Sequence, residues 1–426
     1  MEASSGGGGG GGGGKRPAAS SSVKSLGGDL LCSIFSLLDH VQLIRCSVVC
    51  KSWSSTIFTS SLMKDLYFRK YPRRISGEPD PSLGSMRRFL QGLAMEDHRS
   101  SFLSASADIH SWRAHNVRIN LCRMRRGLIL TGAEDKVLRL WSADSYKCLD
   151  EYAISNIKPL VDYDFDENKV VGLAGSRICI LRRNKRSFSQ SREGIFKGLC
   201  MRYTDPEAVV GCEDGSARVF DMYSGSCSQI IRMRVGPVQC LALTEEQLIF
   251  GGSTFGNIAV ADLSSGELIA SLKSKFSPTG MKSLSFNMHS HLLFAGSTSG
   301  YAHCWDLRTM RPLWETRISP NVIYSTHHLS ADASTLAAGG LDGVLRLLSQ
   351  STGELLSSFV MDIGLPVSSD DRQEKTEKRT ARRLSDGICI ENIPRSARPP
   401  ITCLAVGLKK VVTVHNDKHL SMWRFP

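Results

Sequence analysis

The sequence predicts a small all-α module followed by a large all-β domain of repeated units, and three observations support this fold class. Apolar residues at helical spacing are confined to the first quarter of the 426-residue chain. The remainder contains short runs rich in Val, Ile and Leu, separated by Gly, Ser and Asp turns, which are typical of strands. A strand-turn-strand pattern also recurs about every 40 to 45 residues, apart from one wider gap before its last copy. Each copy ends in a bulky apolar residue: Trp141, Leu181, Phe220, Val260, Trp305, Leu348 and Trp423.

The composition of the first residues predicts an unfolded tail. Residues 1–24 are rich in Gly and Ser and carry too little apolar surface to fold, so we expect disorder there. They lack the apolar stretch of a signal peptide, and Glu2 stands where N-myristoylation requires glycine. No later segment approaches the roughly 20 apolar residues that span a bilayer. We therefore expect a cytoplasmic or nuclear protein that is not bound to a membrane.

Residues 25–72 predict the helical module, which begins with an amphipathic helix over 29–38. Short helices are also expected over 40–50 and 51–58. Three helices of this length bury little apolar surface alone, so a partner surface is expected. Residues 73–100 continue with apolar residues at helical spacing, which predicts a packed helical linker.

At these residues the chain resembles the F-box family. The match comprises Leu26, Asp29-Leu30-Leu31, Ile34-Phe35-Ser36, Leu38-Asp39, Leu43, and Val49-Cys50-Lys51 followed by Trp53. Gly27 and His40 stand where the family usually has proline. Since proline pre-sets the backbone for a helix start, we expect the start of the first helix and the first turn to be less stable. The resemblance implies docking onto a Skp-type adaptor that links the chain to a cullin-RING ubiquitin ligase. The contacts carried over are Leu26, Leu30, Ile34, Leu38, Leu43, Val49, Lys51 and Trp53, and packing into the module's own core is the alternative for each.

Residues 101–426 resemble the WD-repeat family, which implies an all-β, seven-bladed WD40-type β-propeller. The first repeat is the most complete, with His115, Thr131, Asp135 and Trp141 in the positions of the family's structural hydrogen-bonded tetrad. The second repeat rests on spacing and strand pattern alone. The last repeat has only three strands before the chain stops, so residues 101–112 are expected to supply the fourth. Leaving that edge unpaired would favour aggregation.

Loops that lead from one blade to the next carry at least one basic residue each. They lie on one face of such a ring, so they predict a positively charged recognition surface for an acidic or phosphorylated protein segment. The alternative is solvated surface charge in a chain of net charge +12. The residues are Arg113, Lys158, Arg192, Arg234, Lys275, Arg317, Arg395 and Arg398. A charged insertion at about 364–398 lies in the last of these loops, and its first part predicts disorder. Within it, Arg382-Arg383-Leu384-Ser385 resembles a site for a kinase that reads basic residues.

The two resemblances together imply a substrate receptor of a Skp-cullin-F-box (SCF) ubiquitin ligase. We expect it to be non-catalytic, because no nucleophile motif, phosphate-binding loop or metal-ligand spacing is present. No cofactor or metal is expected, and nucleic acid is a disfavoured partner. One alternative is a receptor for the other propeller-using cullin ligase, because Trp305, Asp306 and Arg308 resemble that family's WDxR box. A scaffold without a ubiquitin role is another.

Overall fold

The computed structural model describes residues 28–59, 63–64, 67, 82–154, 159–183, 187–190, 194–274, 279–361, 377–385 and 390–426. Residues 1–96 and 97–426 form two compact units. Several expectations lie outside the described residues: the tail, Leu26, Lys158, Arg192, Lys275, and the part of the insertion at 364–376.

The first unit is helical. Its elements are α1 (Gly28–Ser36), α2 (His40–Ser47), α3 (Lys51–Thr59) and most of α5 (Leu83–Phe102). Asp39 caps α2 in spite of the missing proline: its Oδ1 accepts from Gln42 N at 2.8 Å, and its own N donates to Gln42 Oε1 at 3.3 Å. This reciprocal pair satisfies two amides of the first turn. The core consists of Leu31, Phe35, Leu43, Ile57, Phe58, Met63, Met86, Phe89 and Leu90.

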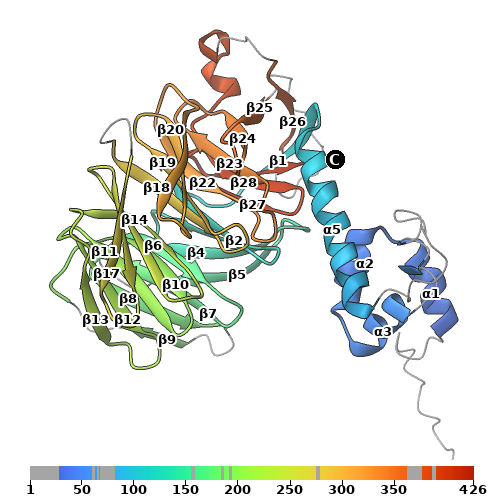
Figure 1. Cartoon of the computed structure of the whole chain (residues 1–426), viewed down its shortest axis with the longest axis horizontal. Coiled ribbons are helices and arrows are strands. Elements are labelled where there is room, and N and C mark those ends of the chain that lie inside the picture. Colours follow the sequence, from blue (N-terminus) through green and yellow to red (C-terminus); the bar gives the residue numbers. More distant parts are fainter. Residues whose placement is uncertain are drawn as a thin grey trace, which may run out of the picture. The chain divides into compact units, whose positions relative to one another are not determined.

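The second unit consists of antiparallel sheets that follow one another in chain order (Figure 1). Five of its described sheets have four strands each. They are β2 (Ile119–Arg125), β3 (Leu128–Ala133), β4 (Val137–Ser142) and β5 (Cys148–Ala153); β6 (Leu160–Phe165), β7 (Lys169–Ala174), β8 (Arg177–Arg182) and β9 (Ser187–Gln190); β10 (Gly198–Thr204), β11 (Glu207–Cys212), β12 (Ser216–Asp221) and β13 (Cys227–Arg232); β14 (Val238–Leu243), β15 (Leu248–Ser253), β16 (Asn257–Asp262) and β17 (Leu268–Lys273); and β18 (Met281–Asn287), β19 (Leu292–Ser297), β20 (Tyr301–Asp306) and β21 (Arg311–Arg317).

The sixth sheet has nine strands, in the order β22-β23-β24-β25-β26-β1-β29-β28-β27. Its strands are β1 (Ser106–Arg113), β22 (Ile323–His327), β23 (Thr335–Gly340), β24 (Leu345–Ser349), β25 (Leu355–Met361), β26 (Glu377–Arg383), β27 (Cys403–Gly407), β28 (Lys410–Val414) and β29 (His419–Arg424). Two short 3-10 turns, η2 (Ile390–Asn392) and η3 (Arg395–Ala397), precede β27.

The first strand of each four-stranded sheet and the two end strands of the nine-stranded sheet contact one another in a closed ring, which we call the inner ring. It runs β2, β6, β10, β14, β18, β22 and β27, and β27 contacts β2 again. The all-β, propeller-like part of the predicted fold is therefore present. Ring closure follows the prediction, because β1 pairs with β29 from Asp108↔Arg424 to Arg113↔His419.

The insertion does not follow the prediction. Disorder was expected for its first part, but Glu377–Arg383 form β26, which pairs with β1 on one side and with β25 on the other. Ala381 is the one fully buried side chain of β26, and it packs in a core that also contains Ile109 and Phe359. For residues 377–383 the expectation was wrong, because backbone pairing with two open strand edges, rather than an apolar pattern, holds this charged strand.

Candidate functional site

The helical unit leaves a set of large apolar side chains in water. Leu30 and Ile34 are exposed on α1, and Leu37, directly after the end of α1, is 85% exposed. At the junction of α2 and α3, Val48 is 80% and Val49 63% exposed. These five residues are called the apolar patch below. An apolar patch that stays exposed to water, although the unit has its own core, is typical of a surface that binds a partner.

The structure divides the described members of the predicted adaptor contacts into three groups. Leu30, Ile34, Val49 and Lys51 are exposed. Leu43 is buried in the core and is therefore not available to a partner in this structure. Leu38 and Trp53 are half-buried against the same core, and the Trp53 ring meets that of Phe35 edge to face, with 5.5 Å between centroids.

Sequence reasoning left two exposed residues of the apolar patch, Leu37 and Val48, out of the predicted contacts. Leu37 continues the α1 stripe at i+3 from Ile34, so helical spacing could have found it. Val48 ends α2 as its C-cap residue, and its exposure depends on how the following turn runs.

In the second unit, hydrogen bonds join three of the four predicted tetrad residues, and Asp135 does not complete the chain. Thr131 Oγ1 lies 2.8 Å from His115 Nε2 and accepts from Trp141 Nε1 at 2.9 Å. Asp135 Oδ1 lies 4.0 Å from His115 Nδ1, beyond hydrogen-bond length. Burial lowers the pKa of His115 to about 4, so the ring is neutral at pH 7. Thr131 is fully buried and engaged, which makes it a structural group rather than a nucleophile.

An equivalent set occurs in the last repeat. Thr413 Oγ1 lies 2.7 Å from His415 Nε2 and accepts from Trp423 Nε1 at 2.8 Å. From the sequence, Trp423 was predicted only to end the last repeat. The same spacing of Thr and Trp, ten residues apart, could have identified this second set.

Comparison with known proteins agrees with both units. A family model described as F-box-like matches residues 29–69. An F-box/WD-40 repeat-containing protein of Arabidopsis thaliana is 45% identical over 431 residues, which covers 95% of each chain. The chain belongs to the F-box/WD-40 repeat-containing proteins. More distant matches are autophagy-related protein 16 of Arabidopsis thaliana, 18% identical over 58% of this chain and 52% of that protein, and WD repeat-containing protein 90 of Xenopus tropicalis, 23% identical over 45% and 12%.

In this F-box/WD-40 repeat protein, the described basic loop residues have different surroundings. Arg234, Arg317 and Arg395 are exposed, and their side chains form no hydrogen bond or ion pair with the described part of the chain. Arg113 donates to the backbone oxygen of His115 at 3.4 Å and to Asn116 Oδ1 at 3.2 Å. Arg398 Nε donates to the Ile393 oxygen at 2.9 Å, so it holds the loop that enters the last sheet. Three of the predicted arginines are therefore available to a ligand.

The predicted WDxR residues lie at the end of β20. Trp305 is buried in the core between sheets. Arg308 is exposed, but its guanidinium donates two hydrogen bonds to the Asp306 carboxylate, from Nε to Oδ1 at 2.9 Å and from Nη2 to Oδ2 at 2.8 Å. Its guanidinium is thus already held in a bidentate pair.

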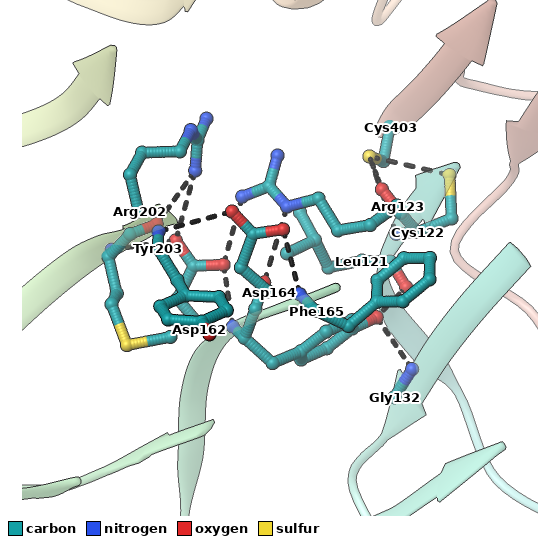
Figure 2. A network of polar contacts seen from close by, with 12 residues as sticks. Leu121, Cys122, Arg123, Gly132, Asp162, Asp164, Phe165, Arg202, Tyr203 and Cys403 are labelled. Atoms are coloured by element: carbon teal, nitrogen blue, oxygen red, sulfur yellow. Dashed lines mark hydrogen bonds and ion pairs between the residues drawn. The ribbon is translucent and has the colours of Figure 1, made fainter. Parts of the chain in front are cut away.

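The inner ring carries an ionic network that the sequence did not reveal (Figure 2). Arg123 on β2 reaches Asp162 on β6, with Nη2 to Oδ1 at 3.0 Å, and Arg202 on β10 approaches the other oxygen of Asp162 at 3.5 Å. Arg125 pairs with Asp164 at 3.0 Å. These contacts join three successive first strands, about one repeat apart in sequence.

Two further findings concern the described residues. None of their helices is long and apolar enough to cross a membrane. No group of three or more His, Cys, Asp or Glu side chains among them could hold a metal ion.

Proposed function

We propose that this protein is the substrate-recognition subunit of an SCF ubiquitin ligase and is itself non-catalytic. The helical unit would dock onto a Skp-type adaptor, and the β unit would bind the target protein. In this proposal the β unit is a seven-bladed WD40-type propeller: each four-stranded sheet is one blade, and β26 joins two further blades within the nine-stranded sheet. The protein would act in the cytoplasm or nucleus, which imaging of a tagged chain would test.

The observation that carries the adaptor proposal is the apolar patch. Burying a Leu or Val side chain is worth roughly 1.5 to 3 kcal/mol, so several such residues can supply most of the affinity of a stable complex. Because Leu37 and Val48 are almost fully exposed, burying them against a partner would contribute nearly all of this free energy to binding. Family membership gives the patch its expected partner, since F-box modules generally bind Skp-type adaptors.

Co-purification with a Skp-type adaptor tests this proposal. We expect the double variant Leu37→Asp, Val49→Asp to lose adaptor binding by about a hundredfold or more, because two apolar contacts are replaced by charges that must be desolvated. The helical unit should stay folded, since neither side chain belongs to its core. Alanine at Leu38 and Trp53 would be a poorer test, because both pack against that core.

The matched control places the same two charges on the β unit, at Leu149 and Leu313. These are 48% exposed apolar residues outside the F-box. The control variant should co-purify with the adaptor like the natural chain. If the Leu37/Val49 variant binds the adaptor as well as the control does, the docking proposal is wrong.

The alternative adaptor has its own test, the variant Arg308→Ala. Since the Arg308 guanidinium is paired with Asp306, we expect this change to leave binding to the Skp-type adaptor intact. Loss of cullin association in this variant would favour the other propeller-using ligase. Absence of any cullin from purified complexes would favour a scaffold.

For target recognition we propose that the unpartnered loop arginines bind an acidic or phosphorylated segment. Arg234 lies between β13 and β14, Arg317 ends β21 before β22, and Arg395 begins η3 before β27. Each thus precedes a strand of the inner ring, so we infer that they share one end of the ring. Reversing Arg234 and Arg317 to Glu should weaken target capture by well over tenfold, because each charge-assisted hydrogen bond is worth about 1.5 to 3 kcal/mol. Adaptor binding should not change. Target capture that is indifferent to this reversal and to salt would place the target elsewhere.

A further inference from the structure

The ionic network of the inner ring has carboxylates whose acceptor capacity is already used. Asp162 Oδ1 accepts from its neighbour Tyr163 N at 2.8 Å as well as from Arg123, and Oδ2 accepts from Met201 N at 2.8 Å as well as from Arg202. Asp164 likewise accepts from two backbone amides, at 2.9 and 3.2 Å, in addition to Arg125.

The guanidinium groups, in contrast, keep unused donors. Arginine has five N–H groups in a fixed fork. Nη1 of Arg123, and Nε and Nη2 of Arg202, have no partner in the described part of the chain. The two side chains are 19% and 22% exposed, and none of these three nitrogens is a fully buried atom without a partner. A dissolved acceptor is therefore able to reach them.

Charge also accumulates on the inner ring. Its described first strands contain four cationic residues, Arg123, Arg125, Arg202 and Lys282, but only two acidic ones, Asp162 and Asp164. The excess affects neighbouring groups: burial, His328, Arg123 and Arg202 together lower the pKa of His327 to about 3. Lys282 lies apart on β18, so the three arginines around Asp162 and Asp164 leave one unbalanced positive charge. On a partly buried surface this charge favours an anion more than the same charge in bulk water does.

We propose that Arg123 and Arg202 form a binding site on the inner ring for a small phosphate-bearing anion. The two guanidinium groups flank Asp162, one at each of its carboxylate oxygens, so a phosphate oxyanion beside that carboxylate can accept from the unused donors of both. An oxyanion also offsets the positive charge that Asp162 and Asp164 leave unbalanced. This site is separate from the proposed target surface at the loops and does not depend on the ligase role.

Titration calorimetry of the full-length chain with inorganic pyrophosphate tests this site, in buffer without divalent cations and at constant ionic strength. We expect saturable binding of one pyrophosphate per chain, and inorganic phosphate should bind to the same site more weakly. Sodium chloride at equal ionic strength should not compete. Pyrophosphate that fails to saturate, or that chloride displaces equally well, would overturn the proposal.

The variant Arg202→Gln should weaken pyrophosphate binding by about tenfold or more, since it removes a charge-assisted contact. Arg234→Gln is the matched control, because it removes an exposed arginine from the loops, and it should bind pyrophosphate like the natural chain. If Arg202→Gln does not fold, Arg202→Lys keeps the charge but loses the fork, and it should bind more weakly than the natural chain. Binding that follows Arg234 and ignores Arg202 would show that the anion lies at the loops.

Discussion

Strand β26 offers a specific test of how the ring is held together. It lies between β25 and β1, and Ala381 is the one side chain that it buries completely. We predict that Ala381→Asp releases β26 from the sheet and leaves the ring closed, because β1 keeps its separate pairing with β29.

The magnitude follows from the length of the strand. Ordering its seven residues costs on the order of 10 kcal/mol in backbone entropy. Each ladder hydrogen bond returns about 0.5 to 1.5 kcal/mol net, so pairing on both sides roughly offsets that cost. A carboxylate without a counter-charge at Ala381 adds several kcal/mol of desolvation. Release of the strand is then the more favourable outcome.

Amide hydrogen exchange at single-residue resolution can detect this release within β1. Arg383 N donates to the Ala105 oxygen, and Ala114 N donates to the Lys418 oxygen. Since hydrogen-bonded pairs alternate along antiparallel strands, the registers of β1 assign its amides to different neighbours. Residues 107, 109 and 111 bond to β26, whereas 108, 110 and 112 bond to β29. In Ala381→Asp, only the first set should lose protection.

The control is Arg382→Asp, which places the same poor strand former at the neighbouring exposed position. It should keep both sets of amides protected. Equal exchange in the two variants, or loss of protection at residues 108, 110 and 112, would refute the assignment of β26 as a separately held strand.

Three further predictions concern stability. Deleting residues 1–96 should leave a soluble β unit, whereas deleting 1–113 removes β1 and should cause aggregation in size-exclusion chromatography; a monomer with an unchanged thermal midpoint would argue against the closure role of β1. Thr131→Val should lower the free energy of unfolding by about 1 to 3 kcal/mol in urea titrations, because it leaves buried His115 and Trp141 nitrogens without their partner, and a neutral result would contradict the tetrad's structural role. Stability should also fall as pH drops from about 6.5 to 4, by up to ~1.4 kcal/mol per pH unit for each buried histidine, because burial depresses their folded pKa values and the unfolded chain takes up protons first. The histidines concerned are His98, His115 and His328, whose pKa values are lowered to about 4, and His327, whose pKa is lowered to about 3. A thermal midpoint that does not change over that pH range would contradict this prediction.

Much of the fold was predictable because its signals are local. Apolar spacing on α1 and the recurring strand pattern depend on residues a few positions apart, and the tetrad has fixed spacing within one repeat. The same logic predicted that β1 completes the last sheet. It could not predict β26, whose charged sequence has no apolar alternation and whose stability depends on two strand edges far away in the chain.

The sequence by itself determined the family, the order of the two units and the residues that could act. The tertiary structure decided which of those residues face water. Helical spacing places Leu37 and Leu43 in similar apolar patterns, yet one is exposed and the other lies in the core, because exposure depends on what the neighbouring helices cover. In the same way, Arg123, Asp162 and Arg202 are ordinary strand residues in sequence, and only ring closure brings them into one network. The physical reason is that burial and charge pairing are properties of surfaces that meet in space, whereas sequence patterns report only neighbours along the chain.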